Sequence, residues 1–250
     1  MSALAQELSR PIANTPPVGF VGRLKFYGRF ALDLQVATVY RDLRKVLPTL
    51  RGEVLDVGCG MSPYRSLLDP AATRYTGIDV VDEGTFANSN DDVHYFDGLH
   101  IPFEACSFDG VICTEVLEHV PHFQQLVDEI QRVLKPGGRA VLTVPWSARC
   151  HYIPKDYFRY TPSALAIIFA KWGNADVEPR GTDISAIASK VAVLWWRNLV
   201  PRGPARLLTV PLALLLTPVV MAVMLVAHIC LAGRLGDKSD PLGYTITATK

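Results

Sequence analysis

The sequence has no excess of charge of either sign. Its 250 residues contain 25 lysines and arginines against 24 aspartates and glutamates, which gives a formal net charge of +1. Proteins that bind the phosphate backbone of nucleic acids carry a basic surface or a high positive charge. The near balance argues against that class, and we expect no nucleic-acid partner.

Cysteine pairs and a secretion signal are also lacking. The five cysteines are odd in number and form no C-x-x-C pair, which does not suit a disulfide framework. Free thiols fit a reducing compartment. Residues 1–17 have neither a basic start nor a long apolar stretch, as a secretory signal would. We therefore expect a cytoplasmic protein.

Long apolar runs are absent from most of the chain and gather near its C-terminal end. Residues 184–200 are mixed, whereas residues 207–232 contain no acidic or basic side chain except His228. A helix over this second run would extend about 39 Å, enough to reach across a bilayer. Pro211 and Pro218 argue against a straight helix, because proline lacks the amide that the helix needs.

The rest of the chain alternates between helical and strand patterns. The expected helices are 20–50, 63–68, 123–134 and 161–171, and the expected strands are 54–57, 74–79, 93–96, 108–113, 139–144, 175–181 and 244–249. This alternation predicts an α/β fold with a parallel sheet covered on both faces. We divide the chain into an N-terminal arm and helix (1–50), a core (51–183), an apolar helical insertion (184–242) and a final core strand (243–250).

The last strand restricts how the insertion can meet a membrane. If residues 207–232 crossed a bilayer once, strand 244–249 would lie on the opposite side from its sheet. We therefore expect a helical hairpin or re-entrant pair that enters one leaflet from the cytoplasmic side, as a peripheral or monotopic protein. Trp195 and Trp196 suit the membrane interface. The flanking basic residues expected to face anionic headgroups are Lys190, Arg197, Arg202, Arg206, Arg234 and Lys238. The alternative is a soluble hairpin buried in a homodimer.

A glycine-containing loop with an adjacent acid follows the first buried strand, in the run Asp56-Val57-Gly58-Cys59-Gly60. Glycine lets the backbone approach a ligand, and open α/β sheets bind ligands at this edge. A dinucleotide fingerprint would need a third glycine where Pro63 stands, and Asp56 would repel a phosphate. An acid suits an ammonium group instead. A plain strand–turn–helix joint without a ligand is the remaining alternative.

Five motifs in order strengthen the ligand-binding interpretation. They are the loop above, Asp79 at the end of the second strand, Phe96-Asp97-Gly98-Leu99, Thr114-Glu115-Val116-Leu117-Glu118-His119, and Leu134-Lys135-Pro136-Gly137-Gly138. This set resembles the class I (Rossmann-like) S-adenosylmethionine-dependent methyltransferases of type 11, over about residues 53–144. Many members carry a glycine where Ser62 stands, so the start of the following helix is less certain.

The resemblance implies S-adenosylmethionine as the cofactor and assigns roles to individual residues. Asp56, Gly58 and Gly60 would hold the methionine end, and Asp79 would bind the ribose. Around the adenine, Val80 would lie beside the ring, Asp97 would accept from the amino group and Leu99 would pack on the ring; Asp97 as a simple turn cap is the alternative. Cys59, Gly98 and Glu115 complete the predicted cofactor set.

Methyl transfer from a sulfonium needs alignment and, for some acceptors, a base. The candidates are His119, His151 and Tyr157, and the alternative for His119 is a helix cap or a partner of Glu115. The aromatic segment 151–162 follows the fifth strand, where a substrate lid would lie. It either contacts the acceptor or positions the next helix. We expect no metal, because Pro121 keeps His119 and His122 off a common helical face.

These observations predict a methyltransferase that acts on a small-molecule, glycan or lipid-linked acceptor at a membrane surface. A membrane-associated interaction protein that binds the cofactor without turnover is the alternative. The sequence does not name the acceptor.

Overall fold

The computed structural model describes residues 14–80, 93–199, 204 and 206–250. Its first two helices are α1 (Gly19–Arg29) and α2 (Leu34–Val46), and the 3-10 turn η1 (Leu47–Thr49) follows. The prediction of one helix over 20–50 was wrong, because the chain forms two helices there and the second is capped by Asp33. Its carboxylate accepts a hydrogen bond from the Val36 amide at 3.2 Å and so starts a new helix.

Seven strands form one sheet in the order β3-β2-β1-β4-β5-β7-β6. They are β1 (Gly52–Val57), β2 (Thr73–Val80), β3 (Val93–Phe96), β4 (Phe108–Thr114), β5 (Leu134–Pro145), β6 (Asn174–Arg180) and β7 (Gly243–Thr249). All seven lie where the sequence pattern placed a strand, and β5 begins five residues earlier than expected. The sheet has the Rossmann-like arrangement of the predicted fold class.

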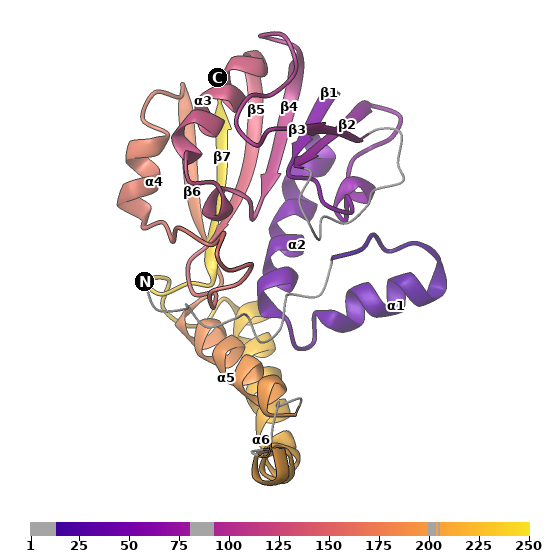
Figure 1. Ribbon diagram of the computed structural model, residues 1–250, viewed down its shortest axis with the longest axis vertical. Helices are drawn as coiled ribbons and strands as arrows, with labels where there is room; N and C mark the ends of the chain where they lie inside the picture. The colour runs from indigo at the N-terminus through magenta and orange to yellow at the C-terminus, as the bar shows by residue number, and fades with distance from the viewer. Residues whose placement is uncertain (1–13, 81–92, 200–203, 205) are drawn as a thin grey trace.

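The sheet is mixed rather than parallel, because β7 runs antiparallel to both β5 and β6. The chain leaves β6 at the carboxyl edge of the parallel strands, passes through two helices and returns at that same edge (Figure 1). A strand that begins where its neighbours end must run in the opposite direction. The prediction of a wholly parallel sheet was therefore wrong for the last strand.

Helices cover both faces of this sheet. On one face, α3 (Phe123–Val133) buries Leu126, Val127 and Ile130 against the side chains of β1, β4 and β5. On the other, α2 buries Val39 and Leu43. Successive side chains of a strand point to opposite faces of the sheet, so each strand contributes residues to both cores. Burial of these apolar side chains is the main stabilising contribution in such a layered fold.

Two of the predicted helices after strands are shorter than expected. The helix predicted over 161–171 is α4 (Pro162–Ile168), which Thr161 caps and which ends where Phe169 and Trp172 turn into the core. The helix predicted over 63–68 is only the 3-10 turn η2 (Arg65–Leu67). A helix N-cap has an extended backbone, whereas Ser62 has a φ of 54°. The Ser62 hydroxyl therefore caps no helix and forms a hydrogen bond with the Tyr75 hydroxyl.

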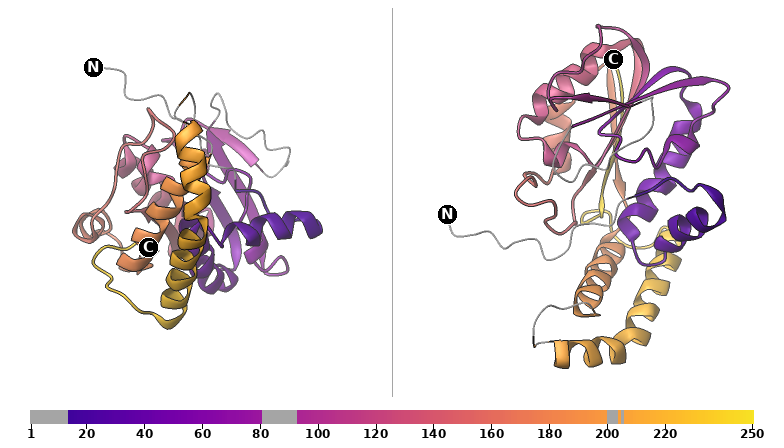
Figure 2. Two further views of the ribbon diagram at one scale, coloured as in Figure 1. Left: turned by 90° about the horizontal axis from the view of Figure 1, so that it is seen from below. Right: turned by 45° about the vertical axis from the view of Figure 1, so that its right-hand side comes forward.

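The helices α5 (Asp183–Leu199) and α6 (Arg206–Gly233) form a hairpin that projects from the carboxyl edge of the sheet (Figure 2). The two helices pack together, and the first part of α6 lies across the end of the hairpin before the helix bends back toward the sheet. Pro211 and Pro218 lie in this half of α6 and explain the bend, because each removes one helical hydrogen bond.

Within the described part of the chain, Leu207–Gly233 is the one helix long and apolar enough to cross a membrane. Its mean hydropathy is 2.5, and 22% of the window is buried. The buried positions include Ala213, Val220, Met224, Ala227 and Cys230, which follow one helical face. Most of the remaining surface of this helix has no packing partner among the described residues.

Candidate functional site

The predicted cofactor residues meet at one edge of the sheet. Strands β1 to β4 are parallel, so their carboxyl ends lie side by side. The residues at or just after these ends are Asp56, Gly58, Cys59 and Gly60 for β1, Asp79 and Val80 for β2, Asp97, Gly98 and Leu99 for β3, and Glu115 for β4. The hairpin α5–α6 leaves the sheet from this same edge.

The loop after β1 needs its glycines for two different reasons. Gly58 has a φ of 68°, and a Cβ there would lie 2.4 Å from Val116 Cγ2. Gly60 also has a positive φ, of 51°, but a Cβ built on it would meet no described atom within 4 Å. The first glycine is required by packing against the segment after β4. The second leaves room above the loop for a ligand that approaches the backbone.

Asp79 connects this loop to the end of β2. Its Oδ2 accepts from the Gly60 amide at 2.9 Å, and its Oδ1 accepts from the Val80 amide at 2.8 Å. Burial raises the pKa of this carboxyl. Each carboxylate oxygen can accept a further hydrogen bond. The two amides therefore fix the orientation of Asp79, and each of its oxygens can still accept a hydrogen bond from a ligand. This arrangement suits the predicted role of binding two ribose hydroxyls.

The neighbouring strand brings the predicted adenine residues together. Val80 is 37% exposed at the end of β2, and a Cβ on Gly98 would lie 3.1 Å from Val80 Cγ1. Asp97 caps its own turn: its carboxylate accepts from the Leu99 amide, the His100 amide and the His100 ring. These hydrogen bonds, led by the one from the His100 amide, lower the pKa of Asp97 to about 2. Its adenine contact stays a prediction.

Asp56 is the most buried acid of the set, with 3% of its surface exposed. Its Oδ2 accepts from the Tyr75 hydroxyl at 2.9 Å, and Oδ1 has no hydrogen-bond partner among the described residues. Burial raises its pKa to about 7, against a smaller lowering effect of Tyr75. A buried carboxylate with an uncompensated oxygen favours a cationic ligand, such as the ammonium of a methionine group.

Glu115 forms an ion pair with a residue that the sequence analysis did not identify as part of the site. Its Oε1 accepts from Arg180 Nη2 at 2.8 Å, and Arg180 is fully buried at the end of β6. The same guanidinium also reaches the Val144 carbonyl, the Thr38 hydroxyl and the Gln35 carbonyl. An arginine near the end of a strand is ordinarily exposed, so the sequence carried no signal for this position.

Comparison with known proteins shows what this chain resembles in sequence and in fold. Residues 55–142 match the family model described as a methyltransferase domain of type 11. The ubiquinone biosynthesis O-methyltransferase of Mus musculus is 29% identical over 180 residues, which cover 62% of this chain and 45% of that protein. The enzyme of the same name from Psychrobacter arcticus is 37% identical over 105 residues, covering 36% of this chain and 40% of its own length. The chain thus spans less than half of these relatives.

A SAM-dependent methyltransferase from Archaeoglobus fulgidus shares the fold, with a TM-score of 0.52 at 16% identity, over 91% of this chain and 99% of that one. Residues 55–142 are therefore a methyltransferase domain of type 11, and the chain has the class I methyltransferase fold. This assignment confirms the predicted fold and the predicted cofactor, S-adenosylmethionine.

Two of the three predicted catalytic residues lie close together beside the predicted cofactor edge. The rings of His119 and His151 are 4.8 Å apart between centroids. His119 follows β4 in the turn η3 (Leu117–His119), and His151 lies in the loop after β5. Burial lowers the pKa of His119. Tyr157 is 46% exposed, and its amide donates to the Glu118 carbonyl at 2.8 Å. Its catalytic role, like those of the two histidines, stays a prediction.

Glu118 is the second residue that sequence reasoning missed. It has no exposed surface, and neither carboxylate oxygen has a hydrogen-bond partner among the described residues. Its Oε1 lies 3.7 Å from His119 Nε2. Burial raises its pKa well above the usual range, and the nearby Glu115 raises it further. The sequence showed Glu118 within a motif, but nothing in the pattern showed that its side chain would be buried.

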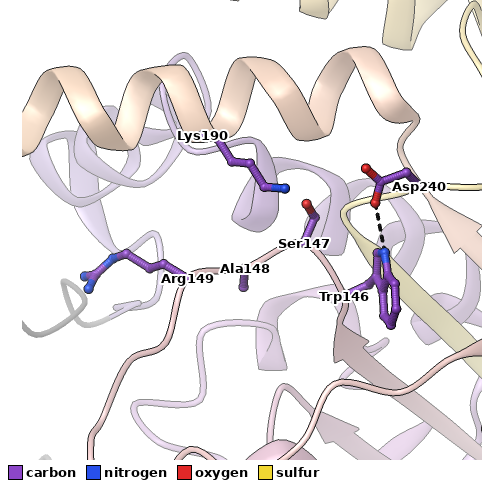
Figure 3. Close-up of a pocket in the computed structure, with 6 residues that line it drawn as sticks. All are labelled: Trp146, Ser147, Ala148, Arg149, Lys190 and Asp240. Atoms are coloured by element: carbon purple, nitrogen blue, oxygen red, sulfur yellow. Dashed lines mark hydrogen bonds between the residues drawn. The ribbon is translucent and has the colours of Figure 1, made fainter. Parts of the chain in front are cut away.

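A cavity of about 360 Å³ opens between the end of β5 and helix α5 (Figure 3). It is lined by Trp146, Ser147, Ala148, Arg149, Lys190 and Asp240. The Trp146 indole donates to Asp240 at 2.9 Å, whereas the buried Ser147 hydroxyl has no partner in the described chain. In the close-up, the Lys190 amine and the Ser147 hydroxyl point toward each other.

Proposed function

We propose that this methyltransferase acts on a small-molecule or lipid-linked acceptor at the cytoplasmic surface of a membrane, and that the acceptor atom is a hydroxyl oxygen. The observation that carries the proposal is the position of the apolar hairpin, which leaves the sheet at the same edge as the cofactor loop. An acceptor held in the outer part of a leaflet would then reach the cofactor without leaving the membrane surface.

The surface of α6 supports the membrane part of this proposal. Large apolar side chains cover it on the side away from α5, and several are more than half exposed: Leu207, Leu208, Leu212, Leu214, Leu215, Val219, Leu225, Val226 and Ile229. A contiguous apolar surface of this kind on a soluble protein marks a contact with a membrane or another protein. Trp196, 49% exposed on α5, suits the interfacial region.

The connection of the hairpin supports a monotopic arrangement. Both of its ends are joined to strands of one sheet, β6 before it and β7 after it. The bend in α6 directs its first part across the tip of the hairpin rather than along it (Figure 2). Such a bent helix suits insertion into one leaflet, with both ends of the hairpin on the cytoplasmic side.

The names of the two relatives described above support an oxygen acceptor, since both are O-methyltransferases of ubiquinone biosynthesis. When bound, S-adenosylmethionine supplies an electrophilic methyl group on a sulfonium. The chain would fix the ribose through Asp79 and the ammonium end through Asp56. The acceptor loses its proton and gains the methyl group, while the sulfonium becomes a neutral thioether.

Flotation with phosphatidylglycerol-containing vesicles tests the membrane contact. The wild-type protein should float with the vesicles, and the double variant Leu212→Glu/Leu215→Glu should lose most of its binding. Burial of a leucine side chain contributes about 1.5–3 kcal/mol, so two losses amount to roughly a hundredfold or more in partitioning. The control is Ile167→Glu, a change at a side chain that is 76% exposed on α4 of the core. Equal flotation of all three proteins would contradict the proposal, and a stable dimer that does not float would favour the buried hairpin.

Transfer of labelled methyl from S-adenosylmethionine to extracts of cells that carry the gene tests turnover. We expect label in one lipophilic product, and no label with Asp79→Ala. A protein that binds the cofactor but labels nothing in lipid or aqueous fractions would support the interaction-protein alternative. Label only in a water-soluble product would overturn the membrane acceptor.

A further inference from the structure

Three potential metal ligands converge beside the cofactor edge, although the sequence led us to expect no metal. Glu118 and His119 come from η3, and His151 comes from the loop after β5. One ligand atom from each lies within 4.8 Å of the other two. The pair considered from the sequence was His119 with His122, but His122 is exposed at the start of α3. The fold brings in His151 instead, which is 32 positions along the chain from His119.

The hydrogen bonds of the two histidines determine where their lone pairs lie. His119 Nδ1 is 2.6 Å from the Lys155 carbonyl, and His151 Nδ1 is 3.0 Å from the Arg149 carbonyl. A carbonyl only accepts, so each Nδ1 carries the hydrogen and each neutral ring keeps the lone pair on Nε2. Histidines that bind metals show this arrangement, with the other ring nitrogen donating to a backbone carbonyl or a carboxylate.

The lone pair of His119 therefore lies beside a carboxylate that has no donor. His119 Nε2 and Glu118 Oε1 are 3.7 Å apart, which is too long for a hydrogen bond. Glu118 is completely buried, and among the described residues neither of its oxygens has a hydrogen-bond partner. A buried carboxylate in this condition is costly unless a cation or a proton compensates it. A proton would compensate the Glu118 carboxylate alone. One cation bound between Glu118, His119 and His151 would accept a lone pair from each of the three side chains.

Three charged neighbours of this position already have partners of their own. Asp156 is already committed, since it pairs with Arg159 through both oxygens and accepts from the His151 amide. Its Oδ2 also lies 3.6 Å from His151 Nδ1 and so orients that ring. Glu115 faces Arg180. Arg159 is held by Asp156 and by two backbone carbonyls, those of Phe158 and Arg149.

We propose that Glu118, His119 and His151 bind one divalent ion of the Mn²⁺ to Zn²⁺ series. Two imidazoles and one carboxylate suit these borderline ions better than Mg²⁺ or Ca²⁺, which prefer all-oxygen sites. Three protein ligands leave coordination positions open, as in catalytic rather than structural sites.

The chemical consequence rests on the proposed function. An acceptor hydroxyl bound to the ion would ionise more readily, because the positive charge stabilises the oxyanion. Its proton leaves to solvent, the oxygen–carbon bond forms and the sulfur–carbon bond of the cofactor breaks.

Calorimetric titration of the full-length, chelator-treated protein at pH 7.5 tests the site, with ZnCl₂ and MnCl₂ as separate probes. Wild type and His122→Gln should bind one equivalent, and Glu118→Gln and His151→Gln should bind at least about a hundredfold more weakly. A second measurement is thermal unfolding with and without the metal, which should raise the midpoint of wild type and not that of Glu118→Gln. S-adenosylmethionine affinity, measured on every variant, shows that each one is folded.

Absence of binding by wild type up to millimolar metal would overturn the proposal. Equal binding by Glu118→Gln, or loss of binding in His122→Gln, would overturn it as well. These measurements need no acceptor, so they are separate from the proposed function. Stoichiometric metal with no methyl transfer would count against the proposed function alone, and transfer that a chelator leaves unchanged would count against the metal's chemical role.

Discussion

The replacement Asp56→Asn should make the cofactor-free protein less sensitive to pH. Asp56 is 3% exposed, and within the described part of the chain only the Tyr75 hydroxyl hydrogen-bonds its carboxylate. Burial raises its pKa from 3.8 to about 7. Asparagine has nearly the same shape, carries no charge at any pH, and keeps an oxygen that can accept from Tyr75.

The sign and size of the effect follow from proton linkage. Between pH 4 and 7 the unfolded chain has already released the Asp56 proton, whereas the folded chain still holds it. The unfolded state then binds fewer protons, so the free energy of unfolding falls as the pH rises. With the pKa moving from 3.8 to about 7, the total effect is about 4 kcal/mol, of which roughly 2.6 kcal/mol appears between pH 5 and pH 8.

Urea unfolding of both proteins at pH 5 and pH 8, in the same mild detergent, measures this difference. The wild type should lose about 2.6 kcal/mol more than Asp56→Asn over the interval, since the contributions of all other groups cancel. The same variant should bind S-adenosylmethionine more weakly at pH 8, where the carboxylate would face the ammonium. Equal pH dependence of the two proteins would refute the reasoning, because it would mean that burial does not perturb Asp56.

Three further outcomes are expected. Asp79→Ala should weaken S-adenosylmethionine binding strongly in calorimetry, because two ribose hydrogen bonds of about 1.5–3 kcal/mol each are lost; unchanged affinity would remove the ribose assignment. Arg180→Met should lower the free energy of unfolding by about 3 kcal/mol, since it leaves Glu115 without its partner, and a neutral result in urea would mean that the pair is not needed. Tyr157→Phe should reduce turnover with little change in cofactor affinity, and the reverse pattern would place Tyr157 at the cofactor.

Local pattern was enough to predict the strands and the cofactor edge. Strand positions depend on short runs of apolar residues, and the glycines and acids of the cofactor loop follow β1 and β2 directly in the chain. Parallel strands place their carboxyl ends at one edge, so Asp56, Gly58 and Asp79 were expected together before any coordinates. The predicted hairpin likewise needed only an apolar run and a strand on each side of it.

The tertiary structure alone decided which side chains are buried and which distant ones meet. Arg180 is polar and near a strand end, yet packing against α2 and β5 buries it completely. The direction of β7 depends on where the chain re-enters the sheet, and no local preference encodes that. Glu118, His119 and His151 converge because β4 and β5 are neighbours in space. Sequence periodicity reports the environment along one element, whereas a site built from two elements depends on how they pack.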